Sequence, residues 1–263
     1  MALMLALAIT AITLISMYYF AWGPWWFPPF ISEYGAAYDK QFMLTLVITG
    51  IIFFFAQLGL AYAVFRYRGQ REGKVHYSHG NNALEVLWTS AAAVLFIGLV
   101  FWGQNIWVRA HLRPADPGSM QVEVWGQQFT WYIRYPGPDG GFGRTKPELM
   151  KESIGQPLGI DPDDAAGKDD IVATVLAVPV NREVEVILRS KDVIHSFFVP
   201  ELRLKQDAVP GLENRLHFTA SKIGRYELPC AELCGLGHYQ MRTFLDVKTE
   251  ADFEQWLRDQ AAP

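Results

Sequence analysis

The sequence predicts a protein of two parts: α-helical segments that span a membrane, followed by an all-β domain outside it. The charge distribution separates the two parts, because residues 1–32 contain no Asp, Glu, Lys or Arg. Residues 112–263 instead carry 17 basic and 23 acidic residues, so the two parts face different solvents. The scarcity of charge (19%) and the abundance of aromatic residues (14%) exclude a disordered or nucleic-acid-binding chain.

Two uncharged runs of 23 residues, beginning at Phe42 and Val86, predict a membrane hairpin. Each run is long enough to cross a hydrocarbon core of about 30 Å at a rise of about 1.5 Å per residue. We therefore expect helices over about residues 42–65 and 85–108, within a hairpin that occupies residues 33–110.

The loop between these two helices predicts how the hairpin is oriented. It carries four basic residues and a single acid: Arg66, Arg68, Arg71 and Lys74 against Glu72. By the positive-inside rule this loop is cytoplasmic, so the chain after residue 108 lies on the outer side. We expect a multi-pass protein of a bacterial-type inner or plasma membrane, with its β domain in the periplasm.

The N-terminal segment, residues 1–32, is interpreted as an additional transmembrane helix. A cleaved signal peptide is the alternative, but the segment lacks the basic leader and the small-residue cleavage site of such peptides. If the segment is retained, Trp22, Trp25 and Trp26 lie in the outer aromatic belt of the membrane. The prolines at positions 24, 28 and 29 then end the helix.

From about Ser119 the pattern changes to short β-rich runs that predict an antiparallel sandwich or barrel over residues 111–250. In these runs Val, Ile, Tyr and Phe alternate with polar residues, and Gly, Pro, Asp and Asn separate the runs. Residues 251–263 predict a short amphipathic C-terminal helix and tail.

A long irregular insertion, residues 136–170, interrupts the β pattern and is either functional or mobile. It contains five aspartates close to Gly167: Asp161, Asp163, Asp164, Asp169 and Asp170. These acids suit a calcium ion or a basic electron donor, although their spacing is not that of an EF-hand; an ordinary solvated loop is the simpler interpretation.

Metal-binding side chains gather in the segment PCAELCGLGHYQM. Two thiols, an imidazole and a thioether fall within 12 residues: Cys230, Cys234, His238 and Met241. Soft sulfur together with imidazole selects copper over calcium or magnesium. A loop with Cys, His and Met in this order is typical of mononuclear blue-copper sites, and a second thiol allows both thiolates to bridge two coppers.

A dinuclear site needs a second imidazole, and His195 is the candidate because it follows the predicted strand EVEVILRS. The simpler alternative is a structural disulfide between Cys230 and Cys234. The joint occurrence of thiol, imidazole and thioether donors in a β domain favours copper.

These motifs, from about residue 42 to the C-terminus, resemble subunit II of the haem–copper terminal oxidases of the cytochrome c oxidase type. The resemblance implies a membrane hairpin followed by a cupredoxin-like Greek-key domain that holds the dinuclear copper centre CuA. It also implies the copper ligands: His195, Cys230, the backbone carbonyl of Glu232, Cys234, His238 and Met241.

The resemblance implies roles for four further groups. The carboxylate of Glu232 matches one that helps to hold magnesium at the interface with subunit I. Glu85 matches a carboxylate at the mouth of a proton channel, although a helix-entrance acid near the positive end of the helix dipole explains it equally well. Phe129 stands where the family usually has a Trp that receives the electron, and we expect electrons to enter near Phe129 and Trp131 on the outer face.

The resemblance further implies partners: oxidase subunit I with its haems, other oxidase subunits, and cytochrome c or a cupredoxin as donor, free or within a supercomplex. The chain lacks the C-x-x-C-H haem attachment motif, so we expect haems only in a partner subunit. A complete set of copper ligands argues against a quinol-oxidising subunit. A CuA subunit of a nitric oxide reductase and a membrane-tethered copper chaperone remain the alternatives.

Overall fold

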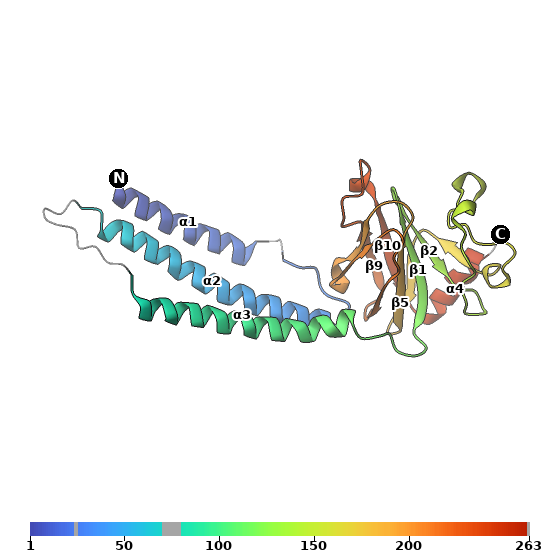
Figure 1. Ribbon diagram of the computed structural model, residues 1–263, viewed down its shortest axis with the longest axis horizontal. Coiled ribbons are helices and arrows are strands. Elements are labelled where there is room, and N and C mark those ends of the chain that lie inside the picture. Colours follow the sequence, from blue (N-terminus) through green and yellow to red (C-terminus); the bar gives the residue numbers. More distant parts are fainter. Residues whose placement is uncertain (24–25, 70–79, 262–263) are drawn as a thin grey trace. The chain divides into compact units, whose positions relative to one another are not determined.

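The structure is a computed structural model that describes residues 1–23, 26–69 and 80–261 (Figure 1). It divides into two compact units, Met1–Trp26 with Ala37–Asn105, and Phe27–Ala36 with Ile106–Pro263. The first unit is helical and the second holds the β domain.

Three helices form the first unit, as expected: α1 (Ala2–Trp22), α2 (Gly35–Arg66) and α3 (Asn82–His111). All three are long and apolar enough to cross a membrane. The helices α2 and α3 extend beyond the uncharged runs, because a helix continues into the charged residues that flank an apolar span. Gln41 of α2 donates a hydrogen bond to the carbonyl of Leu99 in α3 at 3.3 Å, which ties the predicted hairpin together.

Three loop charges that orient the hairpin, Arg71, Glu72 and Lys74, lie outside the described residues. So do Trp25 of the expected aromatic belt and Pro24, one of the prolines expected to end the first helix. Trp22 at the end of α1 is 75% exposed within the chain, as an anchor in a membrane interface requires.

The β domain contains ten strands in the described chain: β1 (Met120–Gln127), β2 (Thr130–Tyr135), β3 (Ile171–Ala173), β4 (Leu176–Pro179), β5 (Glu183–Ser190), β6 (His195–Val199), β7 (Leu204–Ala208), β8 (Asn214–Thr219), β9 (Gly224–Pro229) and β10 (Arg242–Lys248). They form sheets of order β3-β2-β1-β5-β8, β4-β10-β9 and β6-β7. The predicted architecture, membrane-type helices followed by an all-β domain, is confirmed.

The expectation of purely antiparallel strands is wrong at two places. Strand β1 pairs with β5 in parallel, and β10 pairs with β4 in parallel. In both cases the partners are far apart in sequence, so the chain crosses between sheets before it returns to the neighbouring position.

Alternating apolar side chains from the strands fill the core. In β5 the inward-facing residues Val184, Val186 and Leu188 are completely buried. Helix α4 (Glu250–Ala261) covers one side of the domain through Phe253, whose ring lies 6.3 Å from that of Tyr135. Thr249 caps this helix by accepting a hydrogen bond from the backbone N–H of Asp252.

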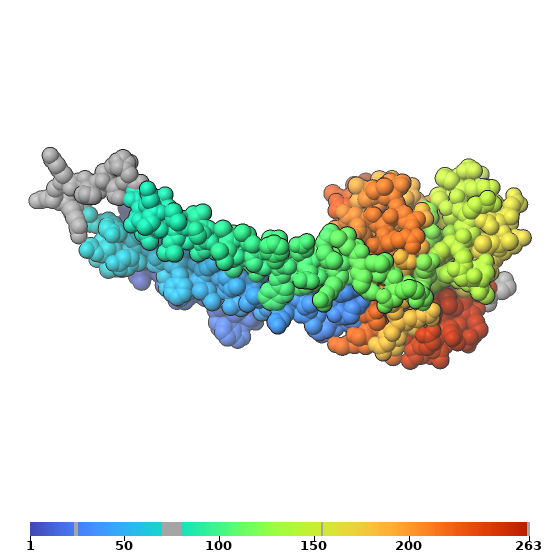
Figure 2. Space-filling model, turned by 60° about the horizontal axis from the view of Figure 1, so that its bottom comes forward, coloured from blue at the N-terminus to red at the C-terminus, as the bar shows by residue number. Residues whose placement is uncertain are grey.

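The insertion folds onto the β domain as a lobe of short 3-10 turns (yellow-green in Figure 2). The turns are η1 (Pro147–Leu149), η2 (Glu152–Ile154) and η3 (Ala165–Gly167). The insertion is therefore structured rather than an irregular loop.

Residues between α1 and α2 pack with the β domain. The backbone N–H of Ile31 donates to the carbonyl of Glu201, and the carbonyl of Ile31 accepts from Ser221 N–H, both at 2.8 Å. Ile31 is 1% exposed. The chain thus joins the domain before it enters α2.

Candidate metal centre

The loop between β9 and β10 brings two thiols and a thioether together. The backbone N–H of Cys230 donates to the carbonyl of Met241 at 2.9 Å, which closes the loop at its base. The Sγ atoms of Cys230 and Cys234 lie 4.0 Å apart, and Sδ of Met241 lies 3.6 Å from Sγ of Cys234. All three side chains are buried.

His238 and Glu232 add two further donor atoms from the same loop. His238 begins the turn η5 (His238–Gln240), and its Nδ1 lies 3.6 Å from Sγ of Cys234. The backbone oxygen of Glu232 lies 3.3 Å from Sγ of Cys230, whereas the Glu232 side chain is exposed. The carbonyl of Glu232 is thus the atom that faces the thiols, and its carboxylate is left available to a partner.

His195 reaches the same place from the first residue of β6. Its ring is completely buried, with Nδ1 lying 3.9 Å from Sγ of Cys230. On the other side of the ring, Nε2 donates to Oδ1 of Asp192 at 2.7 Å. Because the carboxylate engages Nε2, Nδ1 is the nitrogen left to bind a metal.

The donor atoms fit a metal better than a disulfide. A disulfide needs sulfur atoms about 2.05 Å apart, so the 4.0 Å separation leaves both cysteines as free thiols. The disulfide alternative is therefore wrong. A metal–thiolate bond is about 2.3 Å long, so an ion between these sulfurs can contact both. Two thiols, two imidazoles and a thioether form the soft donor set that copper prefers.

The electrostatics of the thiols also fit a cation. Burial alone would raise the pKa of Cys230, but hydrogen bonds from His195 and the surrounding backbone outweigh it and lower this pKa to about 6. Burial and the neighbouring Cys230 thiolate raise the pKa of Cys234 to about 11. A bound cation stabilises both thiolates, which removes the penalty that keeps the second thiol protonated.

The two aromatic residues expected at the outer face differ in position. Phe129 is 39% exposed, whereas Trp131 is completely buried, so the surface location expected for Trp131 is wrong. Trp131 alternates along β2 with Ile133 and Tyr135, and all three face the core. This alternation at every second residue is the sequence signal that predicts a buried Trp131. The ring of Trp131 lies behind the surface, 6.0 Å from the ring of His195.

Glu85 lies in the first turn of α3, and its side chain is exposed within the chain. Asn81 caps this helix by accepting hydrogen bonds from the backbone N–H groups of Ala83 and Leu84 at 3.1 and 3.2 Å. This position near the positive end of the helix dipole suits an acid, and the role in proton uptake stays a prediction.

Two residues that support the candidate ligands were not identified from the sequence. Asp192 holds His195, and Gln128 donates from its side chain to the carbonyl of Cys234 at 2.5 Å. The backbone N–H of Gln128 also donates to Asp192 at 2.8 Å. Their roles depend on contacts between distant segments, although an Asp placed three residues before a candidate metal-binding His was a usable signal for Asp192.

A second group of potential ligands, Glu33, Glu183 and His217, was also missed by sequence reasoning. Here the guanidinium of Arg113 binds Glu183 and lies 3.3 Å from Nδ1 of His217. The hydroxyl of Tyr34 lies 2.9 Å from the same nitrogen. The arginine supplies the positive charge that a metal would bring, so this group is an ion-pair cluster.

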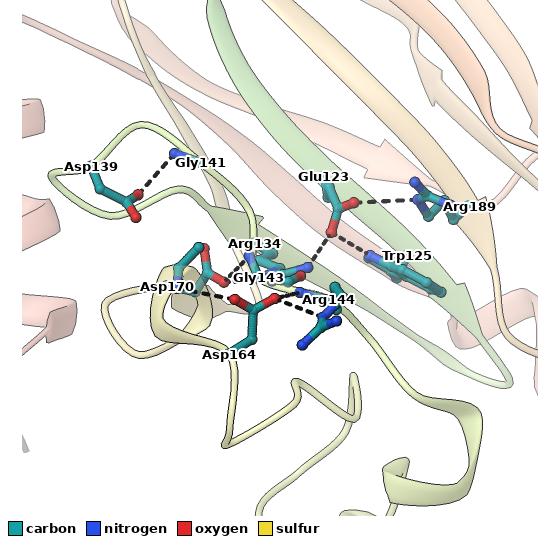
Figure 3. A network of polar contacts seen from close by, with 11 residues as sticks. Glu123, Trp125, Arg134, Asp139, Gly141, Gly143, Arg144, Asp164, Asp170 and Arg189 are labelled. Carbon is teal, nitrogen blue, oxygen red and sulfur yellow. Dashed lines mark hydrogen bonds and ion pairs between the residues drawn. The ribbon is translucent and has the colours of Figure 1, made fainter.

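The acids of the insertion are largely committed to basic partners. Asp170 and Glu123 bind the buried guanidinium of Arg134, which is 1% exposed (Figure 3). Asp164 binds Arg144 at 3.1 Å, and Asp161 binds Lys146 at 2.8 Å. A calcium ion would have to displace these basic groups. The network instead attaches the insertion to the sheet.

Comparison with known proteins identifies the family. Residues 120–247 match the model of the family described as cytochrome c oxidase subunit II, periplasmic domain. The alternative cytochrome c oxidase subunit 2 of Bradyrhizobium diazoefficiens is 37% identical, and the alignment covers 97% of this chain and 91% of that protein. The chain belongs to the cytochrome c oxidase subunit II family. The predicted resemblance is therefore confirmed, and the chain is a CuA-type subunit of an oxidoreductase complex.

Two further proteins extend the comparison with the cytochrome c oxidase subunit II family. Cytochrome c oxidase subunit 2 of Thermostichus vulcanus is 32% identical, with 89% of this chain and 78% of that protein covered. The crystal structure of the periplasmic domain of cytochrome oxidase subunit II of Bradyrhizobium japonicum is 28% identical, covering 56% of this chain and 95% of that chain, with a TM-score of 0.41.

The curated relatives do not favour the nitric oxide reductase alternative, since they are named as cytochrome c oxidase subunits. They do not favour the copper chaperone alternative either, and the described domain is built of β-sheets rather than the thioredoxin-like α/β fold in which such chaperones carry the Cys pair.

Proposed function

We propose that this chain is the electron-input subunit of a respiratory cytochrome c oxidase. It accepts electrons from cytochrome c or a cupredoxin at a dinuclear CuA centre and passes them to haem in subunit I. There oxygen is reduced to water, coupled to proton translocation. The observation that supports this proposal is the convergence of His195, Cys230, Cys234, His238 and Met241 around two thiols 4.0 Å apart.

When bound, the dinuclear copper takes up and releases one electron at a time with little change in geometry. The protein favours such exchange by holding its donor groups in fixed positions. Four of the five side chains lie on one loop closed at its base by the Cys230–Met241 backbone bond. The fifth, His195, is completely buried and held by Asp192. Burial excludes water, so few groups need to reorganise when the charge changes.

Electrons enter near Phe129, the exposed aromatic side chain beside the ligand loop. An ideal Cβ built on Gly237 would lie 2.4 Å from Cδ2 of Phe129, so the ring rests directly on the backbone next to His238. The acidic excess of residues 112–263 attracts a basic donor at long range. For a soluble basic donor, the association rate should therefore fall steeply as salt rises; for a donor fixed in a supercomplex, it should not.

The exposed side of the ligand loop binds a partner subunit. The ligand loop exposes three apolar side chains, Leu233, Leu236 and Tyr239, at 78%, 98% and 80%. Exposed apolar groups in one loop support its burial against another protein, which we assign to oxidase subunit I. We further propose that the exposed carboxylate of Glu232 on this loop helps to hold a magnesium ion at that interface.

Glu85 lies at the cytoplasmic mouth of a proton path, in a multi-pass inner-membrane protein whose β domain is periplasmic. The Glu85→Gln substitution should slow oxygen reduction but leave reduction of copper by the donor unchanged. Full turnover in that variant would leave Glu85 as a residue of the helix start only.

Single-turnover kinetics of the assembled oxidase test the proposed function. Reduced cytochrome c is mixed with the enzyme, and copper and haem reduction are followed separately by absorbance. Cys234→Ser should abolish haem reduction by cytochrome c but not oxygen consumption driven by a small chemical reductant of haem. Normal haem reduction by cytochrome c in Cys234→Ser would refute electron input through this site.

A further inference from the structure

The tip of the hairpin between β1 and β2, residues Gly126 to Phe129, contributes no candidate ligand, yet it touches both ligand-bearing segments. These segments are the histidine arm, residues 191–195, and the cysteine loop, residues 230–241. We infer that this tip is a clamp that fixes the spacing between the two segments, and that Gln128 is its positioning residue. The inference rests on the proposed copper centre and deepens it.

On the histidine side, the tip holds both the backbone and the ring. The backbone N–H of Lys191 donates to the carbonyl of Gly126 at 3.0 Å. An ideal Cβ built on Gly126 would lie 2.8 Å from Cδ2 of His195, so the ring packs directly on the tip and only glycine fits there. The backbone N–H of Gln128 donates to Oδ2 of Asp192 at 2.8 Å, while Oδ1 of the same carboxylate holds His195.

On the cysteine side, one side chain makes the polar contact. Nε2 of Gln128 donates to the carbonyl of Cys234 at 2.5 Å, and the ring of Phe129 packs on Gly237. A single residue, Gln128, thus bonds to Asp192 through its backbone and to Cys234 through its side chain. The two bonds form a continuous connection from His195 to Cys234.

The connection has a specific consequence for the centre. His195 faces Cys230, whereas His238 and Met241 face Cys234. Near Cys230 the two segments meet directly, through the Phe197–Cys230 bridge and a bond of 3.0 Å from the backbone N–H of Ala231 to the carbonyl of Ser196. At Cys234, the bond from Gln128 supplies the connection to the histidine arm. The clamp limits how far these segments move apart. Loss of the Gln128 side-chain bond should therefore loosen the copper ligands without removing any of them.

Gln128→Met tests the clamp, because methionine keeps the length and lacks the amide donor. The matched control is Gln121→Met in β1 of the same hairpin, since the side chain of Gln121 donates instead to Glu185 of β5 at 2.8 Å, outside both ligand-bearing segments. Both variants are made in the full chain, purified in detergent and loaded with copper. The readouts are the rate of copper loss to a chelator, the midpoint potential and the paramagnetic copper spectrum.

We expect Gln128→Met to lose copper about tenfold faster, within the range for substitutions of groups that orient metal ligands. Its midpoint potential and copper hyperfine splitting should also change. Gln121→Met should match the wild type in all three readouts. If Gln128→Met does not fold, Gln128→Asn, which is one methylene too short to reach Cys234, makes the same test.

Equal copper-loss rates and spectra for Gln128→Met and wild type would overturn the clamp and leave the proposed function intact. Absence of a dinuclear copper signal in the wild type would instead refute the proposed function itself. The two failures are therefore distinguishable.

Discussion

Two substitutions of Asp192 should weaken copper binding by different amounts, although this residue is not a predicted ligand. Oδ1 of Asp192 accepts hydrogen bonds from Nε2 of His195 and from the backbone N–H of Val193, both at 2.7 Å. Oδ2 accepts from the backbone N–H of Gln128. In Asp192→Asn the remaining side-chain oxygen can still accept from His195. The NH2 group that replaces Oδ2 then faces the N–H of Gln128, so that hydrogen bond is lost. Asp192→Ala removes all three acceptor contacts.

The expected loss of copper affinity is about tenfold for Asp192→Asn and about 100-fold for Asp192→Ala, the range for groups that orient a metal-binding histidine. These factors correspond to about 1.4 and about 2.7 kcal/mol of binding free energy. The negative charge of Asp192 adds to the effect. Burial alone would raise the pKa of this carboxyl, but hydrogen bonds from Gln128 and His195 outweigh burial and lower it, so the carboxyl stays ionised.

Competition titration of the copper-free chain against a chelator of known affinity measures the loss. Asp207→Ala is the matched control, because Asp207 bonds at 2.7 Å to Ser196, the neighbour of His195, without touching the ring. Its copper affinity should stay close to that of the wild type. Wild-type affinity in Asp192→Ala would show that this carboxylate does not orient His195 and would refute the reasoning.

Three further substitutions or conditions test other parts of the structure. Arg134→Met should lower the unfolding free energy by about 3–5 kcal/mol, because it removes the basic partner of the buried Asp170 and leaves Glu123 with Arg189 alone; Arg144→Met, at a side chain that is 73% exposed, should cost about 0–1 kcal/mol in the same thermal melts. Met241→Leu should retain both coppers but shift the midpoint potential measured by redox titration, since a thioether is a weak ligand. Hydrogen bonds from a lysine and from a backbone N–H lower the pKa values of Asp161 and Asp164 below the ordinary 3.8, so their contribution to stability is present above pH 3.8 and is lost as the pH falls further. Protection factors of the amides in the insertion, measured by hydrogen exchange and corrected for the intrinsic pH dependence of exchange, should decrease at pH values below 3.8 but not at pH 5, and equal protection factors at both would contradict this account.

The helices and the proximity of four candidate ligands could be predicted because their signals are local. An uncharged run of 23 residues predicts a spanning helix whatever its neighbours are. Cys230, Cys234, His238 and Met241 fall within 12 residues, so any closed loop there brings them near one another. Their chemistry alone favours copper.

The features that were mispredicted or missed depend on distant contacts. The parallel pairing of β1 with β5 joins strands about sixty residues apart, which an alternating pattern does not specify. Asp192 and Gln128 acquire their roles only when the β1–β2 hairpin meets the ligand segments. The burial of Trp131 is different, because its alternation with Ile133 and Tyr135 carried that information in the sequence.

Copper content measured together with the paramagnetic spectrum tests the central claim most directly. The full chain is loaded with copper in detergent, and copper per chain is determined alongside the electron paramagnetic resonance spectrum of the wild type and of Cys234→Ser. We predict two coppers per wild-type chain and a spectrum in which one unpaired electron is shared by both, with that signal absent from Cys234→Ser. One copper per wild-type chain, or an unchanged spectrum in Cys234→Ser, would contradict a dinuclear centre bridged by Cys230 and Cys234.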